Sequence, residues 1–115
     1  MKEEISILGI IYKISFKTRK QDKKLENVDG YTDTYLKNIV VSEKEDFNEQ
    51  WDKNRIEIYQ KKVLRHEIIH AYLYESGLDI NSNKVYSWAE NEEMVDWIAI
   101  QSPKIFETYK ELDIL

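Results

Sequence analysis

The residues best suited to chemistry are the two histidines, the only ones in the chain, which lie in the run His66-Glu67-Ile68-Ile69-His70. On an α-helix, residues four apart share a face with Cβ atoms about 5–6 Å apart, so two imidazoles can bind one tetrahedral metal ion. Glu67 projects about 100° away around the helix. From there it can take a proton from a metal-bound water. This HExxH pattern predicts a zinc site with Glu67 as general base, a hydrolase arrangement; the alternative is two ordinary helix residues that happen to be four apart.

The segment that carries these residues has the composition of a long helix. Residues 54–76 contain no Gly or Pro and are rich in good helix formers, and Gly77 is expected to end the helix. Apolar positions recur at steps of three and four, which predicts a buried stripe that includes the second histidine. The stripe consists of Ile56, Tyr59, Val63, His70 and Leu73.

A catalytic zinc site needs three protein ligands and one open position, so one ligand must come from elsewhere in the chain. The chain has no cysteine, and the longer pattern HExxHxxGxxH is excluded because Leu73 and Ser76 stand at its glycine and its third histidine. Carboxylates remain, and the best cluster lies in a second helical stretch at residues 88–101, which we call the glutamate helix.

Two carboxylates of the glutamate helix share one face, because Glu92 and Asp96 are four residues apart. That face also carries the apolar residues Trp88, Val95 and Ala99. We expect Glu92 to bind zinc and Asp96 to accept a hydrogen bond from the far ring nitrogen of a liganding histidine. The adjacent Glu93 is the other candidate ligand, and a solvated acidic helix face is the alternative to both.

The motif and the glutamate helix together resemble the gluzincins, in which a glutamate on the helix after HExxH supplies the third zinc ligand. Residues 91–96 are similar to the N-E-x-x-x-D pattern of thermolysin-type enzymes. The short chain and residues 64–71 and 75–78 are similar to the minigluzincins and to the ImmA/IrrE-type metallopeptidases of phages and mobile elements. Two departures matter: Glu93 directly follows Glu92, and no third histidine is present for the transition state.

The resemblance implies two further roles. In gluzincins an edge strand beside the cleft pairs with an extended peptide, and the matching strand here is residues 38–42; an ordinary solvent-facing edge is the alternative. This candidate substrate-binding strand consists of Asn38, Ile39, Val40, Val41 and Ser42. With both histidines assigned to the metal, Tyr86 is our candidate for stabilising the oxyanion, with a packing role as its alternative.

The composition predicts one domain, residues 1–115, with a single core. The net charge of −5 and the mixed signs along the chain argue against a nucleic-acid surface, and Asp22 dilutes the basic stretch at residues 17–24. No apolar run approaches the roughly 18–20 residues of a membrane span, and the absence of cysteine fits a reducing compartment. We therefore expect a cytoplasmic protein.

The order of elements predicts an α+β fold. Residues 5–11 are expected to form a strand rather than a signal peptide, and residues 12–17 alternate as a half-buried strand does. Asp29-Gly30 is expected to form a turn before a second strand at residues 35–42. We expect a small twisted N-terminal β-sheet on one side of the HExxH helix and the glutamate helix on the other.

The chain is expected to close with a separate C-terminal helix. Ser102-Pro103 should end the glutamate helix and cap this last helix, because Ser favours the N-cap and Pro the first helical position. Its apolar stripe would be Ile105, Tyr109 and Leu112. The whole would be a minimal zincin-like core.

These expectations describe a small zinc-dependent peptidase, expected to be an endopeptidase, with Zn²⁺ as cofactor and a protein or peptide as substrate. Resemblance to the phage-borne group implies a regulatory target such as a repressor in a bacterial host, and a latent form of the enzyme. Two alternatives remain open. One is a zinc-stabilised, non-catalytic interaction module with the same fold, and the other is a structural domain without metal.

Overall fold

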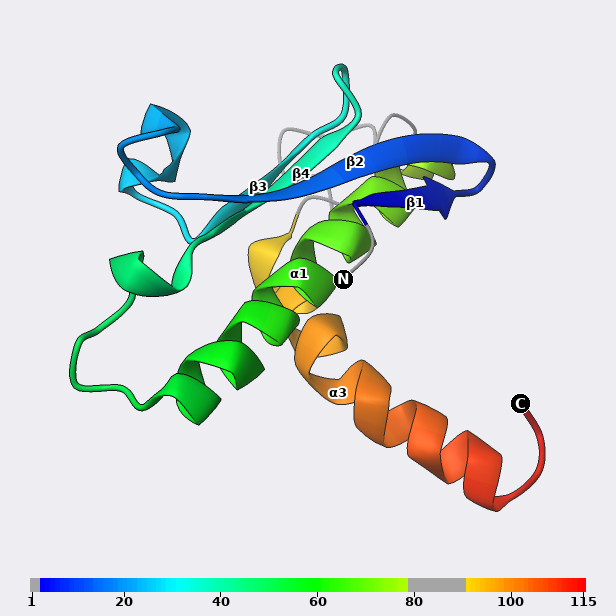
Figure 1. Cartoon of the computed structure of the whole chain (residues 1–115). Helices are drawn as coiled ribbons and strands as arrows, with labels where there is room; N and C mark the ends of the chain where they lie inside the picture. The colour runs from blue at the N-terminus through cyan, green and yellow to red at the C-terminus, as the bar shows by residue number, and fades with distance from the viewer. Residues whose placement is uncertain (1–2, 79–90) are drawn as a thin grey trace.

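The computed structural model describes residues 3–78 and 91–115, and it has an α+β fold in which four strands precede two helices (Figure 1). The strands are β1 (Glu4–Ile7), β2 (Ile10–Lys17), β3 (Gly30–Asp33) and β4 (Asn38–Ser42). The helices are α1 (Lys53–Glu75) and α3 (Glu92–Glu111), and two short 3₁₀ helices are η1 (Lys23–Glu26) and η2 (Lys44–Asp46). The expected α+β class is confirmed, and the sheet and α3 contact different sides of α1.

The first apolar run forms a hairpin rather than one strand. The chain turns at Leu8 and Gly9, whose φ angles are 50° and 87°, and two consecutive positive φ angles are typical of a tight type I′ hairpin turn. β1 then pairs antiparallel with β2, with Ile5 opposite Tyr12. The predicted strand at residues 5–11 is therefore wrong in its extent, whereas the alternating strand at residues 12–17 is confirmed.

The strand order in the sheet is β1-β2-β4-β3, so β4 lies inside the sheet. It pairs parallel with β2, with Ile14 opposite Ile39, and antiparallel with β3, with Tyr31 opposite Val40. The prediction that residues 38–42 form an edge strand is wrong, because both backbone edges of β4 are already paired. The edge strand on that side is β3, which the sequence patterns did not predict.

Gly30, predicted to lie in a turn, is instead the first residue of β3. A Cβ at this position would come within 2.8 Å of Val63 Cγ1 and 3.0 Å of the Val40 carbonyl oxygen. The absence of a side chain therefore allows β3 to pack directly on α1, which brings this strand close to the histidine pair.

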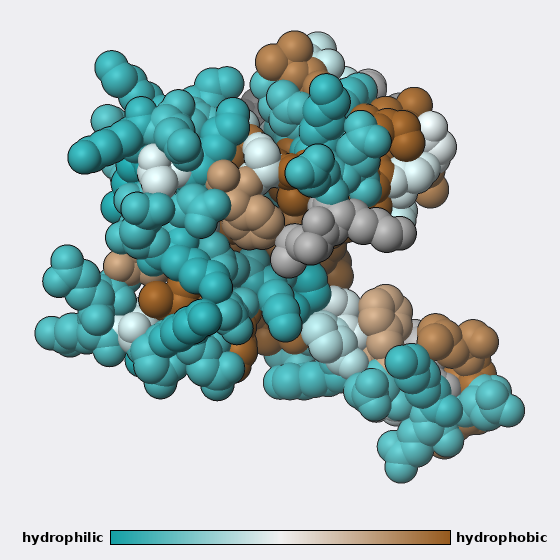
Figure 2. All heavy atoms as spheres, viewed as in Figure 1, coloured by the Kyte–Doolittle hydropathy of each residue, from teal (hydrophilic) through white to brown (hydrophobic). Residues whose placement is uncertain are grey.

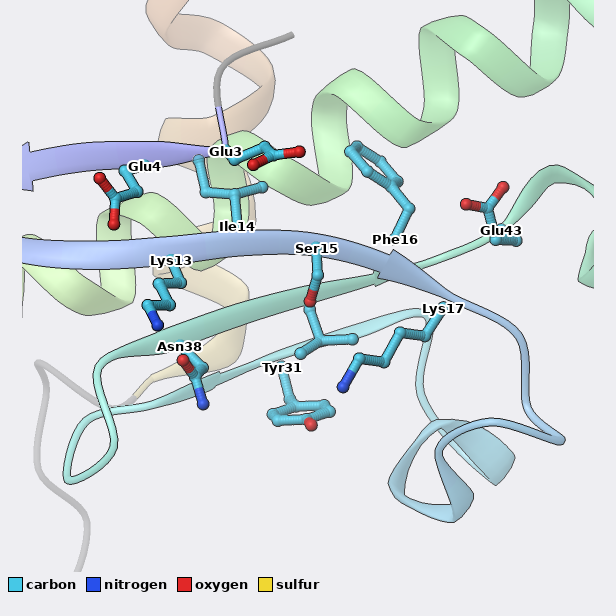
Figure 3. A pocket seen from close by; sticks show the side chains of 11 residues that line it. Glu3, Glu4, Lys13, Ile14, Ser15, Phe16, Lys17, Tyr31, Asn38 and Glu43 are labelled. Carbon is cyan, nitrogen blue, oxygen red and sulfur yellow. The ribbon is translucent and has the colours of Figure 1, made fainter.

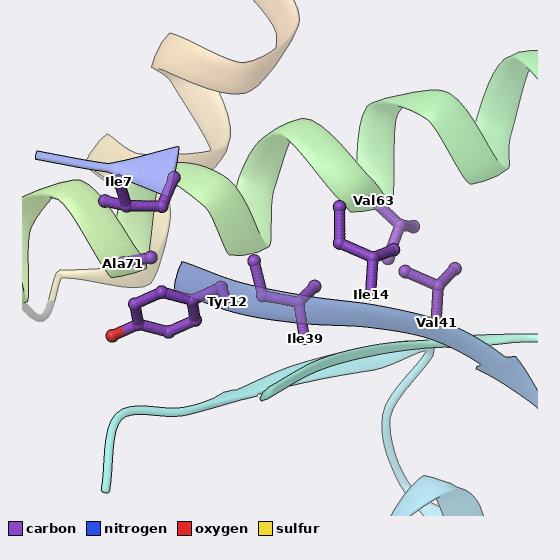
Figure 4. Packing of buried hydrophobic residues seen from close by; sticks show 7 residues of the cluster. All are labelled: Ile7, Tyr12, Ile14, Ile39, Val41, Val63 and Ala71. Carbon is purple, nitrogen blue, oxygen red and sulfur yellow. The ribbon is translucent and has the colours of Figure 1, made fainter. Parts of the chain in front are cut away.

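The hydrophobic core lies between the sheet and α1 (Figure 4). Its buried members come from three strands and the helix, and they are Ile7, Tyr12, Ile14, Ile39, Val41, Val63 and Ala71. Even-numbered β2 residues and odd-numbered β4 residues face the helix because successive side chains of a strand point to opposite faces. The core therefore fixes which strand passes over each turn of α1.

The opposite face of the sheet carries polar side chains. Lys13, Ser15 and Lys17 of β2 point away from α1, whereas Ile14 and Phe16 point toward it (Figure 3). A shallow hollow of about 1130 Å³ lies along this face. Neither histidine lines it.

Helix α1 begins and ends close to the predicted positions. Asp52 is its N-cap, and its carboxylate accepts a hydrogen bond from the Arg55 amide at 2.7 Å. Gly77, with φ 85°, follows its last turn, as predicted. The buried residues of the helix are Gln60, Val63, Glu67 and Ala71. Glu67 therefore belongs to the face against the sheet, and the prediction that His70 lies on the buried stripe is wrong, because that side chain is only partly buried.

Helix α3 is continuous from Glu92 to Glu111, with Pro103 inside it. The predicted separate C-terminal helix is therefore wrong. A proline cannot donate to the carbonyl oxygen four residues earlier, which is that of Ala99, and here Arg65 Nε of α1 donates to that oxygen at 2.6 Å. A donor from another helix thus satisfies the carbonyl that Pro103 leaves unpaired.

The part of α3 after Pro103 projects away from the sheet and α1 (Figure 1), and apolar side chains are visible on this projecting part (Figure 2). Within the described residues, neither helix is long and apolar enough to cross a membrane.

Candidate metal centre

Two helices bring the predicted metal ligands together. His66 and His70 lie one turn apart on α1, with ring centroids 4.9 Å apart. Glu92 is the first residue of α3, where the Asn91 side chain caps the helix by accepting from the Met94 amide at 2.8 Å. The cap fixes the start of α3, and the first helical side chain therefore lies beside the histidines.

The Glu92 carboxylate bridges the two imidazoles. Its Oε2 lies 3.2 Å from His66 Nε2, and its Oε1 lies 2.7 Å from His70 Nε2. One potential ligand atom from each of the three residues lies within 4.8 Å of the others. Two imidazole nitrogens and one carboxylate oxygen make a donor set that suits zinc and leaves one tetrahedral position for another ligand. The group could hold a metal ion.

Asp96 contacts the other side of the His66 ring, as predicted. Its Oδ1 lies 3.1 Å from His66 Nδ1 and 2.7 Å from Lys62 Nζ. The hydrogen bond from Lys62 is the main cause that lowers the pKa of Asp96, and the contact with His66 adds to it. In the tautomer that carries its hydrogen on Nδ1, His66 donates a hydrogen bond from Nδ1 to the ionised Asp96, and its Nε2 lone pair is directed at the ligand group.

Glu67 is buried, with 7% of its surface exposed, against strand β3. The Thr32 hydroxyl lies 2.9 Å from Glu67 Oε1 and 2.8 Å from the Glu67 carbonyl oxygen, so its single proton can be donated to either. Burial raises the pKa of the Glu67 carboxyl, while the hydrogen bond from Thr32 and the nearby histidines oppose the increase. Glu67 is thus a carboxylate with a raised pKa that Thr32 holds beside the histidines by a hydrogen bond, and such a group suits a general base.

A cavity of about 370 Å³ opens where these groups meet. Glu67, His70 and Glu92 form its helical side, and β3 and the residue that follows it form the other side. The remaining lining residues are Gly30, Tyr31, Thr32, Thr34 and Tyr74. The site therefore adjoins β3, which has a strand partner on one side only within the described residues, and not β4, so the predicted substrate strand from Asn38 to Ser42 does not border it.

Glu93 points to a different part of the surface from Glu92. It lines a separate shallow hollow together with Asn91, Met94 and Trp97. The structure therefore places Glu92, and not Glu93, at the histidines. Val95 and Ala99, predicted to share the face of Glu92, are fully buried. Tyr86 and Trp88 lie outside the described residues.

Three residues of this site were missed by reasoning from sequence: Thr32, Lys62 and Tyr74. Lys62 lies four residues before His66, and this helical spacing could have indicated a cation on the face that meets Asp96. Tyr74 likewise lies four residues after His70. Thr32 has no signal in the sequence, because it reaches Glu67 only through the pairing of β3 with β4.

Comparisons of the chain with protein-family models, with curated proteins and with solved structures find no match. The residues and the geometry of the site therefore support the function proposed below.

Proposed function

We propose that this chain is a zinc-dependent peptidase of the gluzincin type with a zincin-like core, in which His66, His70 and Glu92 are the zinc ligands. The observation that carries the proposal is the placement of Glu67, a buried carboxylate held by Thr32 in the cavity that His70 and Glu92 line. A buried, hydrogen-bonded carboxylate at this place suits a general base that takes a proton from a metal-bound water. When bound, zinc would supply a Lewis acid and lower the pKa of a water molecule.

Other side chains have separate roles in the proposed reaction. Glu67 accepts the proton of the attacking water and passes it to the leaving amine. Asp96, held by Lys62, keeps the His66 ring in one orientation and one tautomer. The edge of β3 that has no strand partner among residues 3–78 and 91–115 binds the substrate backbone as an added strand, in the role predicted for β4.

Tyr74 is the residue that we propose as the hydrogen-bond donor to the developing oxyanion, because it lines the cavity with Glu67 and His70. The substitution Tyr74→Phe removes only the hydroxyl. It should lower kcat and leave zinc affinity unchanged, and an unchanged kcat would exclude this role.

Metal analysis and one substitution test the proposed function. Protein purified without chelator and supplemented with zinc should carry close to one zinc per chain. Glu67→Gln should keep the zinc and lose casein hydrolysis by about 10²–10⁴-fold, because a general base contributes that much. Glu57→Gln, an exposed position on the same helix, is the matched control and should retain activity.

Three results would contradict the proposal: no bound zinc, equal activity in the Glu67→Gln variant, or no hydrolysis of any peptide by the zinc-loaded protein. Zinc binding without hydrolysis would instead favour the non-catalytic interaction module.

A further inference from the structure

The turn between β3 and β4 exposes two large side chains beside the cavity. Tyr35 and Leu36 are 87% and 69% exposed, and they are adjacent in the chain. In Figure 2 a small group of brown atoms lies at the top of the molecule, beside paler ones, where Figure 1 shows the hairpin of β3 and β4. Thr34, the residue just before them, lines the cavity that holds Glu67, His70 and Glu92. The two exposed side chains therefore continue the rim of the proposed active site.

The turn is held in a defined conformation. Asp33 Oδ1 accepts hydrogen bonds from the Tyr35 amide at 3.0 Å and the Leu36 amide at 2.8 Å. Lys37 closes the turn with φ 59°, a left-handed conformation that is unfavourable for a residue with a side chain. Such a conformation persists when its surroundings hold it.

The anchor is the end of α1. Lys37 Nζ donates to Glu75 Oε2 at 2.7 Å and lies 4.9 Å from the centre of the Tyr74 ring. Because Tyr74 also lines the cavity, the same side chain contacts both the anchor of the turn and the proposed site. The position of Tyr35 and Leu36 relative to the cavity is thereby fixed.

We infer that Tyr35 and Leu36 form a binding surface for a bulky apolar side chain of an extended peptide substrate. This inference rests on the proposed function, in which the peptide pairs with the free edge of β3. Thr32 of β3 is level with Glu67, and Tyr35 and Leu36 lie in the turn at residues 34–37 that follows the end of β3. The apolar side chain would therefore lie beyond the end of β3, away from the bond that is cut.

The occupant is a peptide side chain because the surface lies at the end of a strand edge. Within the described residues, β3 has a strand partner on one side only, and a peptide paired with its other side would run past the turn at residues 34–37, where β3 ends. An aromatic and an aliphatic side chain together suit a Leu, Phe or Met residue of the peptide, which they would partly remove from water.

The test is a binding experiment that does not depend on turnover. The zinc-loaded full chain with Glu67→Gln is exposed to a positional-scanning library of fluorescent decapeptides, and affinity is measured by anisotropy. We expect one library position to favour Leu, Phe or Met over Ser by about tenfold in affinity, because partial burial of one such side chain contributes a free energy of that size. Adding Tyr35→Ser and Leu36→Ser should reduce that preference below twofold and leave preferences at other positions unchanged.

The matched control adds Ile58→Ser, which removes an equally exposed apolar side chain, 61% exposed, about 18 Å before His70 along α1. The Ile58→Ser variant should keep the preference for Leu, Phe or Met. Absence of peptide binding, absence of an apolar preference, or a preference that survives in the Tyr35/Leu36 variant would overturn the inference. Casein hydrolysis by the chain with intact Glu67 is measured in parallel. If the chain binds apolar peptides selectively but does not hydrolyse casein, the peptidase proposal is rejected and this binding surface is kept. If the chain hydrolyses casein but the Tyr35 and Leu36 substitutions leave its peptide preference unaltered, this binding surface is rejected and the peptidase proposal is kept.

Discussion

Two glutamates beside the histidines differ in their surroundings, and this difference suits the separate roles proposed for them. Glu67 is buried and accepts a hydrogen bond from Thr32, so its carboxylate is held apart from solvent. The Glu92 side chain is 72% exposed and contacts both His66 and His70. A buried carboxylate of raised pKa suits proton transfer, and one that lies between two imidazole nitrogens suits metal binding.

Substitution of three acidic residues of α3 should separate a metal ligand from its support. Glu92→Ala should weaken zinc binding most, because it removes one of three donors, and Asp96→Ala should weaken it about 10–100-fold by releasing the His66 ring. Glu93→Ala, at the adjacent position in a different hollow, is the control and should leave zinc affinity nearly unchanged. Affinity is measured by competition with a chromogenic chelator. Loss of zinc from the Glu93 variant, with retention by the Glu92 variant, would contradict the ligand assignment.

The Thr32 hydroxyl should matter for hydrolysis and not for metal binding. Thr32→Val keeps the shape of the side chain and removes the donor to Glu67 Oε1. The loss of one hydrogen bond to a charged group, about 1.5–3 kcal/mol, predicts roughly tenfold or greater loss of kcat. Thr32→Ser retains the hydroxyl and should recover most of the activity. Equal rates for the valine and serine variants would show that the hydrogen bond has no role in turnover.

At the scale of elements, the contact between Arg65 and Ala99 explains how α3 continues through a proline. The Ala99 carbonyl has lost its usual donor at residue 103, and Arg65 Nε takes its place at 2.6 Å. Arg65 directly precedes His66 on α1, so this hydrogen bond also holds together the two helices that carry the candidate metal ligands.

A double-mutant cycle tests that contact. Arg65→Met should destabilise the protein by about 1–3 kcal/mol, because it leaves the Ala99 carbonyl without this donor. In a Pro103→Ala background the residue 103 amide can donate to Ala99, so the cost of Arg65→Met should fall by about 1 kcal/mol. Urea unfolding with excess chelator measures both costs without a contribution from metal. An equal cost in the two backgrounds would reject the compensation.

A second contact between elements joins the sheet to the end of α1. The Glu75 carboxylate accepts hydrogen bonds from Tyr12 at 2.6 Å and from Lys37 at 2.7 Å. Burial acts to raise the pKa of Glu75, but the hydrogen bonds and the charge of Lys37 outweigh it, and the net pKa is lowered. A carboxyl with a lowered pKa in the folded state stabilises the fold above its unfolded pKa, and this stabilisation is lost as pH falls through the folded value.

Glu75→Gln should therefore have a pH-dependent cost. At pH 7 the variant should be less stable by about 1–2 kcal/mol, since it loses a charged acceptor of two hydrogen bonds. The difference from the unsubstituted protein should shrink as pH falls below the ordinary glutamate pKa of about 4.3 and through the lowered value of folded Glu75. Thermal unfolding between pH 3 and pH 7 checks this, with Glu57→Gln as the exposed control. A difference that stays constant over this range would contradict the interpretation.

At the scale of the whole molecule, α3 has two parts with different surroundings. The part before Pro103 packs on α1 and contributes Val95 and Ala99 to the interior. The part after Pro103 projects from the body (Figure 1). The radius of gyration, 15.2 Å, exceeds the value of about 13 Å expected for a compact domain of this length, in agreement with that projection.

Zinc should stabilise only the first part of α3, because His66, His70 and Glu92 link the start of this helix to α1. Backbone amides of residues 95–101 should exchange with deuterium more slowly after zinc is added. Amides of residues 105–111 should exchange rapidly with or without zinc, since local opening there does not require the helices to separate. Mass spectrometry of chelated and zinc-loaded protein measures this. Uniform protection of the whole helix, or none, would contradict it.

The sequence by itself determined the features that depend on spacing along one element. His66 and His70 share a helical face because they are four residues apart, and Glu92 and Asp96 reach His66 together for the same reason. The long helix, its end at Gly77 and the α+β class also followed from local composition. Each of these depends on the 3.6-residue period or on residue preference, which a single chain displays directly.

Only the tertiary structure decided which strand adjoins the site. Asn38–Ser42 has the apolar content of a strand whether it lies at an edge or inside a sheet, and its pairing with both β2 and β3 depends on residues distant in the chain. Thr32 meets Glu67 because Gly30 lets β3 approach Val63, and α3 passes through Pro103 because Arg65 of another helix supplies a donor. These outcomes depend on contacts between elements, whose energies local sequence patterns do not contain.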